Sequence, residues 1–124
     1  PKKITSYKTG GLSWHPSGSI YSGSGISEGR ALFSYHANWI SAGNWYLEIL
    51  TPKRKLIFRP LEKLQVQEKG QMQIEEVALD NKVDLDFKPG LYKLTQSFLG
   101  SKQNLVPLKE QTANASTYQK IENR

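Results

Sequence analysis

Cysteine is absent from this chain of 124 residues, and long apolar runs are absent as well. The lack of cysteine excludes a disulfide framework, a thiolate metal site and a cysteine nucleophile. No run of about 18 apolar residues occurs, so the sequence predicts no membrane span, and no apolar signal segment opens the chain. Zero cysteine also favours a reducing, cytoplasmic setting. The first residue is Pro, not Met, which indicates a processed chain or a piece of a longer one.

Acidic residues are fewer than basic ones: 17 Lys and Arg stand against 11 Asp and Glu, which gives a formal net charge of +6. Clustered cations would indicate a nucleic-acid partner, because they neutralise phosphates. Here they are dispersed, and no RRM, zinc-finger or KH pattern organises them. The densest group, residues 53–55, follows Thr51-Pro52 between two apolar runs, which is typical of a solvated hairpin tip. Nucleic acid is therefore not an expected partner.

A period of two in the apolar residues predicts a series of strands. From Arg30 the pattern places Phe33, Tyr35 and Trp39 on one face of a strand, with His36 on the other. An edge strand is predicted at residues 4–7, and further strands at residues 45–50, 56–58, 61–67 and 72–77. Short turns separate these later strands, so neighbours must be antiparallel. Glu48 is expected to pair with a cation on the neighbouring strand.

The period becomes helical near the end of the chain. Apolar residues at i, i+3, i+4, i+7 and i+8 predict a helix over residues 91–99, with Pro89 before it and Gly100 after it. A second helix is predicted from about Pro107 to Glu122. Its expected inner face consists of Leu108, Thr112, Ala115 and Gln119.

Strands followed by helices predict an α+β fold in one domain, residues 1–124. We expect a largely antiparallel, open β-sheet with helices packed on one face. Aromatic residues remain for the other face, which suggests that this face is covered too. A dimer partner is the expected cover.

No motif in the chain carries recognisable chemistry. Residues 23–28 fail the dinucleotide fingerprint because Glu28 stands at the third glycine position, and a loop is expected there. His15 and His36 lack the further ligands that zinc needs, and Ser17 lacks an orienting carboxylate. His36 is expected to be a hydrogen-bonded structural residue. No catalytic, cofactor-binding or metal-ligating residue is assigned.

Two segments resemble a known family. Residues 29–67 read GRALFSYHANWISAGNWYLEILTPKRKLIFRPLEKLQVQ, and residues 87–99 read FKPGLYKLTQSFL. Both are similar to the C-terminal domain of the Gfo/Idh/MocA family, which includes glucose–fructose oxidoreductase and inositol dehydrogenase. Residues 45–49 resemble its W-x-x-E-I strand. Residues 89–99 resemble its G-x-Y-x-Q-x-x-x-F-L helix, although Gln96 does not fall at the position of the family's Gln. Residues 105–121 resemble the family's terminal helix.

The resemblance implies the second half of a two-domain oxidoreductase acting on a sugar, nucleotide sugar or cyclitol. In the family, an N-terminal Rossmann domain binds NAD or NADP, and a Glu-Lys-Pro segment supplies a catalytic Lys. Both are missing here, so this chain alone is expected to be inactive and to hold no cofactor. It is expected to form a homodimer through the sheet face and to shape the pocket for a sugar-like substrate together with the missing domain.

Candidate substrate contacts lie in loops and at strand ends: Trp14, His15, Asn44, Trp45 and Arg59. Trp14 and His15 precede the main sheet in a Trp-His-Pro-Ser-Gly loop. The sequence also allows a second function of a different class. In this alternative the chain is a free-standing module that binds a protein or a glycan through its aromatic sheet.

Overall fold

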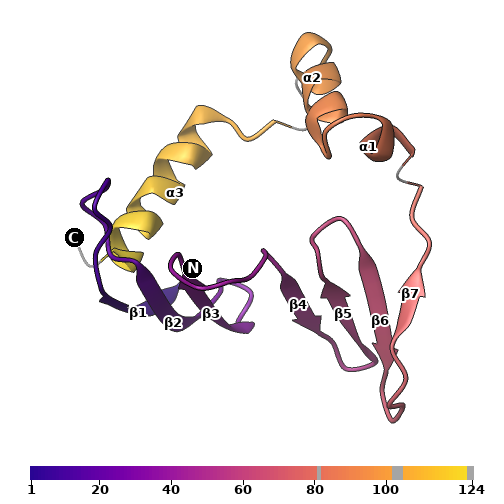
Figure 1. Ribbon diagram of the computed structural model, residues 1–124, viewed down its shortest axis with the longest axis horizontal. Coiled ribbons are helices and arrows are strands. Elements are labelled where there is room, and N and C mark those ends of the chain that lie inside the picture. Colours follow the sequence, from indigo (N-terminus) through magenta and orange to yellow (C-terminus); the bar gives the residue numbers. More distant parts are fainter. Residues whose placement is uncertain (81, 102–104, 123–124) are drawn as a thin grey trace. The chain divides into compact units, whose positions relative to one another are not determined.

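The computed structural model describes residues 1–80, 82–101 and 105–122. The fold is α+β with open antiparallel sheets, as predicted (Figure 1). The chain forms two compact units, which are described one at a time. The first unit consists of Pro1–Ala42 with Val106–Arg124, and the second unit of Gly43–Leu105.

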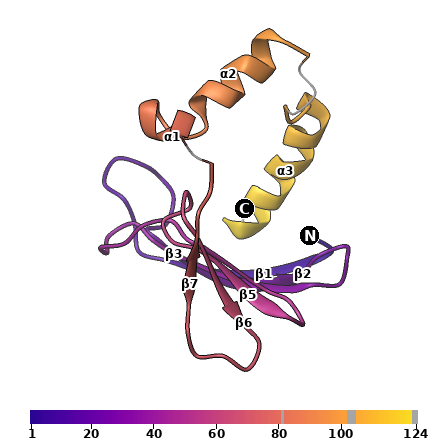
Figure 2. The same ribbon diagram turned by 90° about the vertical axis from the view of Figure 1, so that its right-hand side faces the viewer.

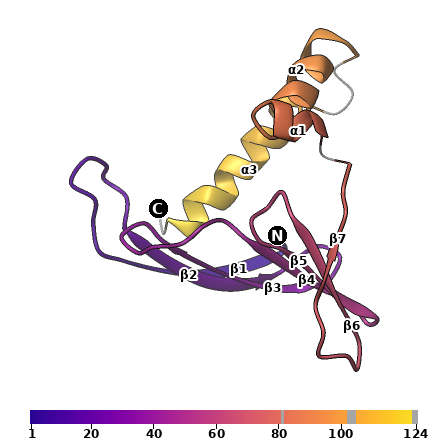
Figure 3. The same cartoon turned by 45° about the vertical axis from the view of Figure 1, so that its right-hand side comes forward.

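The first unit contains a three-stranded antiparallel sheet and one helix. The sheet has the order β1-β2-β3, with β1 at Lys3–Thr9, β2 at Ile20–Ile26 and β3 at Leu32–Asn38. The C-terminal end of helix α3, Leu108–Ile121, contacts β1 on one face of this sheet, and the rest of the helix extends away from it (Figure 3). The Ser6 hydroxyl donates to the carbonyl oxygen of Ile121 at 2.8 Å, and the Ser17 hydroxyl donates to Glu122 Oε1 at 3.1 Å. These bonds fix the C-terminal end of α3 to the sheet.

The predicted loop at residues 23–28 is wrong, because Gly23 and Gly25 lie inside β2. The strand register places Gly23 opposite Tyr35 and Gly25 opposite Phe33. A Cβ on Gly23 would meet the carbonyl oxygen of Thr5 and lie 2.5 Å from Cζ of Tyr35. A Cβ on Gly25 would lie 2.6 Å from Cζ of Phe33. These aromatic rings occupy the space that any larger residue in β2 would need, so the glycines are packing positions.

Strand alternation assigns the aromatic residues of β3 to the same face as Ser6, the residue that bonds α3. Tyr21 is 8% exposed on this face. The expectation that the open face of this sheet carries the aromatic residues is therefore wrong for β3. The rings of Phe33 and Tyr35 lie against Gly25 and Gly23 of β2, where an added Cβ would meet them.

The predicted inner face of α3 is also wrong. Leu108 is 82% exposed, and Thr112, Ala115 and Gln119 are exposed too. The half-buried positions are Asn114, Thr117, Ile121 and Glu122. They lie in the C-terminal half of the helix, where the bonds to the sheet are made. The helix contains few apolar residues, so its periodicity is too weak to select the buried side.

The second unit contains a four-stranded antiparallel sheet of order β4-β5-β6-β7. Its strands are β4 at Leu47–Leu50, β5 at Arg54–Phe58, β6 at Leu64–Glu68 and β7 at Glu75–Val77, which confirms the predicted series. Glu48 pairs with Lys55 at 3.6 Å, as predicted. Ile57 is 7% exposed, opposite Glu48 on one side and Gln65 on the other.

Two helices follow this sheet in the second unit. Helix α2, Leu91–Leu99, has the predicted bounds and ends at Gly100, whose N–H donates to Gln96 O. Helix α1, Lys82–Asp86, was not predicted because five residues are too few to show a helical period. Asp84 Oδ1 accepts a hydrogen bond from the Gly90 N–H at 2.9 Å. The ring of Phe87 stacks on Tyr92 at 5.7 Å, so α1 and α2 lie together (Figure 2).

Candidate functional site

Trp14 and His15 lie in the loop between β1 and β2 of the first unit. His15 forms an isolated bridge with Leu12, and its Nδ1 accepts a hydrogen bond from the Ser17 N–H at 3.2 Å. In the neutral imidazole the proton is then on Nε2, which can donate to a ligand. The ring of Trp14 lies 5.6 Å from that of His15, and Trp14 is 72% exposed. The loop therefore offers an exposed aromatic surface beside a hydrogen-bond donor.

The other three predicted contacts lie in the second unit, at one end of its sheet. Asn44 and Trp45 precede β4, and Arg59 follows β5, which is antiparallel to β4. The guanidinium carbon of Arg59 lies 4.5 Å from the ring centroid of Tyr46, a cation–π contact. Trp45 is 68% exposed. Exposed aromatic rings beside an amide and a guanidinium are group types that stack on and hydrogen-bond to polar ligands.

Tyr46 is the residue of this end that the sequence prediction missed. The hairpin register pairs Leu47 with Phe58, and the next pair outward is Tyr46 with Arg59. A predicted turn at residues 51–54 would have been enough to derive this pair. The sequence prediction did not carry the register across the hairpin.

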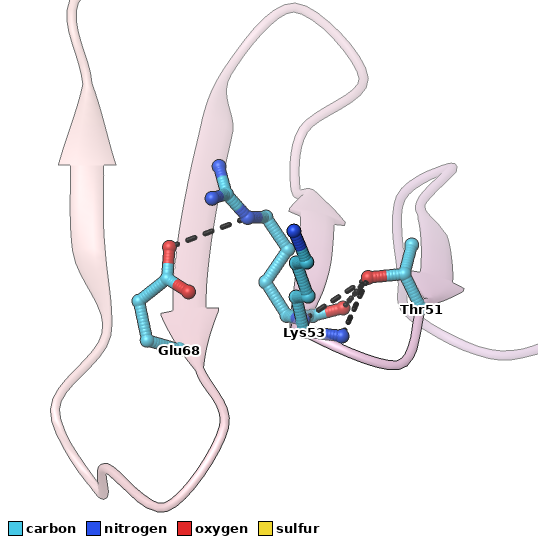
Figure 4. Close-up of polar contacts among 4 residues, drawn as sticks. Thr51, Lys53 and Glu68 are labelled. Carbon is cyan, nitrogen blue, oxygen red and sulfur yellow. Dashed lines mark hydrogen bonds and ion pairs between the residues drawn. The ribbon is translucent and has the colours of Figure 1, made fainter.

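The opposite end of the same sheet carries the basic turn between β4 and β5 (Figure 4). The Thr51 hydroxyl donates to the carbonyl oxygen of Arg54 at 2.8 Å and accepts from its N–H at 3.0 Å. Arg54 Nε lies 3.3 Å from Glu68 Oε1 on β6. Lys53 and Arg54 are exposed, which confirms the predicted hairpin tip.

Comparison with protein-family models, curated proteins and solved structures found no match. The resemblance to the Gfo/Idh/MocA C-terminal domain thus rests on the sequence segments quoted above. The candidate sites rest on the geometry of the two units.

Across residues 1–80, 82–101 and 105–122, no group of three or more His, Asp or Glu could hold a metal ion. His36 lies exposed on β3, whereas the sequence predicts a hydrogen-bonded structural residue there. No helix in the described part of the chain is long and apolar enough to cross a membrane.

The four-stranded sheet has one apolar face. Strand alternation and register assign seven apolar side chains to it: Leu47, Ile49, Leu56, Phe58, Leu64, Val66 and Val77. All seven keep contact with solvent; Leu47 is 49% exposed and Ile49 is 41% exposed. We call these seven residues the apolar face. Contiguous exposed apolar patches of a few hundred Å² are candidates for interaction sites.

The three-stranded sheet has a polar face on the side away from the aromatic residues of β3. The register aligns Thr5, Ser24 and Ser34 in one row across the strands, and Tyr7, Ser22 and His36 in the next. Tyr7 is 72% exposed. We call these six residues the hydroxyl face. An exposed aromatic ring among hydroxyl groups suits a polyhydroxylated ligand better than an apolar protein surface.

Proposed function

We propose that this chain is the substrate-pocket and dimerisation domain of an NAD(P)-dependent oxidoreductase that acts on a sugar, nucleotide sugar or cyclitol. The chain performs no catalysis alone. The family resemblance supports the oxidoreductase assignment, and the exposed apolar face is the observation that supports dimerisation. The missing domain supplies the nicotinamide cofactor, and this chain supplies pocket residues such as Asn44, Trp45 and Arg59.

The size of the apolar face determines how strong such a dimer would be. Strands lie about 4.8 Å apart and rise about 3.3 Å per residue, so four strands of four to five residues span roughly 300 Å². A standard stable interface takes about 800 Å² from each partner. The apolar face by itself, at roughly 600 Å² for both partners, is smaller than a stable interface, so we expect at most a weak, reversible dimer.

A lysine placed on the apolar face should weaken the dimer. We expect Ile49→Lys to raise the dissociation constant at least about tenfold, because an unpaired ammonium would be buried on association. Leu50→Lys is the matched control, since Leu50 is the next residue of β4, points to the other face and is 77% exposed. Sedimentation equilibrium measures both. A wild-type chain that stays monomeric at millimolar concentration, or equal effects of the two variants, would contradict dimerisation through this face.

The alternative function is a glycan-binding module, and the observation that favours it is the hydroxyl face with Tyr7 at its surface. Calorimetric titration separates the two proposals. The oxidoreductase proposal expects neither NAD(P) nor a free oligosaccharide to bind the isolated chain tightly, because the cofactor and half of the pocket belong to another domain. Tight NAD(P) binding would overturn it. Oligosaccharide binding that Tyr7→Ala abolishes would establish the glycan module instead.

A further inference from the structure

Two lysines stand opposite each other at the basic end of the four-stranded sheet. The β5–β6 register pairs Arg54 with Glu68, and the next pair outward is Lys53 with Lys69. The N–H of Lys69 donates to the carbonyl oxygen of Lys53 at 2.8 Å, so the register continues to this pair. Directly opposite residues have Cβ atoms about 4.5–5.5 Å apart. Two ammonium side chains therefore start from neighbouring points of the backbone.

The acidic residues near this end are already engaged. Glu68 pairs with Arg54 at 3.3 Å, and Glu48 pairs with Lys55 at 3.6 Å. Among the described residues, no carboxylate lies within ion-pair distance of Lys53 or Lys69. Like charges directly opposite across a sheet are destabilising. Natural proteins tend to keep destabilising contacts, such as this pair of like charges, at functional sites.

Hydrogen bonds hold both turns of this end in place. The Thr51 hydroxyl bonds both the N–H and the carbonyl oxygen of Arg54, which fixes the first turn (Figure 4). In the second turn Gly70 has a φ of 82°, a left-handed conformation that glycine adopts without strain, and Gln67 Nε2 donates to Gln71 O at 3.0 Å. A site formed by such turns is ordered before a ligand arrives, which lowers the cost of binding.

A shallow hollow lies between the two turns. Lys69 lines it together with Thr51, Lys55 and Gln67, and the Arg54–Glu68 ion pair also borders it, whereas Lys53 is not among its lining residues. Lysine is a common phosphate ligand in proteins, where it acts as a compact point charge. A phosphate monoester carries close to two negative charges at neutral pH, which matches the two lysines that lack a carboxylate partner.

We propose that Lys53 and Lys69 bind the phosphate group of a small phosphorylated ligand at this end of the sheet. The dianion removes the repulsion between the two ammonium groups. Neither lysine belongs to the apolar face or to the candidate substrate contacts. This phosphate site therefore goes beyond the proposed function. A nucleic acid is the less favoured ligand, because none of the residues at these two turns is aromatic and no ring is available for base stacking.

NMR titration of the full chain with inorganic phosphate and, in a second arm, phenyl phosphate tests the proposal at constant ionic strength. We expect amide shifts confined to residues 51–55 and 67–71. The double variant Lys53→Gln/Lys69→Gln should weaken binding at least about tenfold, because both charges are lost. Tighter binding of phenyl phosphate than of inorganic phosphate would identify an esterified ligand, and equal affinity would identify the free anion.

The matched control is Lys88→Gln/Lys93→Gln, which removes the same charge from exposed positions near α2. It should change the affinity by less than about twofold, since these lysines lie outside the two turns. Equal losses in both double variants, or shifts at lysines throughout the chain, would overturn the site. A single-stranded oligonucleotide that binds more tightly than either phosphate and depends on the same lysines would overturn the small-ligand assignment.

Discussion

Replacement of Gly23 by alanine is expected to destabilise the three-stranded sheet by about 3 kcal/mol, at the upper end for an overpacked position. The new Cβ would meet the carbonyl oxygen of Thr5 and lie 2.5 Å from Cζ of Tyr35. The Tyr35 ring, whose tip lies against Gly23, would have to shift away from β2. The Thr5 oxygen can move only by displacing β1 from β2. Urea unfolding followed by far-UV circular dichroism measures the loss of stability.

The control for this substitution is Ser24→Ala in the same strand. Ser24 is exposed on the hydroxyl face, so its replacement should change stability by less than about 0.5 kcal/mol. Amide hydrogen exchange should show faster opening of β1, β2 and β3 in the Gly23 variant and unchanged exchange in the Ser24 variant. A Gly23→Ala chain as stable as the wild type would show that the two strands can separate without cost, contrary to the packing described.

Replacement of Ile57 by alanine is expected to destabilise the four-stranded sheet by about 3 kcal/mol, because it removes three buried carbons and leaves a cavity. Ile57 is 7% exposed, whereas its neighbours on β5, Leu56 and Phe58, are only half-buried. Ile57→Val, which removes a single methylene, should cost about 1 kcal/mol. Urea unfolding of both variants gives the two values and their ratio.

Met72→Ala is the matched control for Ile57, since Met72 belongs to the same unit and is 95% exposed. Its effect should stay within about 0.5 kcal/mol. Amide exchange should locate the loss in the Ile57 variants to β5 and β6. Similar values for Ile57→Ala and Met72→Ala would mean that Ile57 does not form the core of this sheet.

The local elements of the fold could be predicted from the sequence where apolar spacing is strong. Helix α2 has the predicted bounds because Leu91, Leu94 and Phe98 repeat at helical intervals between Pro89 and Gly100. The strands of the second unit were predicted from alternation and short turns. The buried side of α3 could not be predicted, because the contact depends on Ser6, which lies 115 residues from its partner Ile121.

Features that depend on two strands together could be predicted only by carrying the strand register across a turn. Gly23 and Gly25 have the composition of a loop, and only their position opposite Tyr35 and Phe33 explains them as strand residues. The Tyr46–Arg59 contact and the Lys53–Lys69 pair likewise join residues that the sequence separates by more than ten positions. Such pairs follow from the register, which is set by the turns between the strands.

The first unit is built from both ends of the chain, Pro1–Ala42 and Val106–Arg124, with the second unit inserted between them. A ribosome therefore releases β1, β2 and β3 well before α3 exists. During that interval β1 lacks the helix end that Ser6 bonds, whereas the second unit contains all the strands of its own sheet. Domains fold as units during synthesis, so the inserted unit is expected to complete its fold first. The first unit is expected to complete its fold last, once α3 has been synthesised.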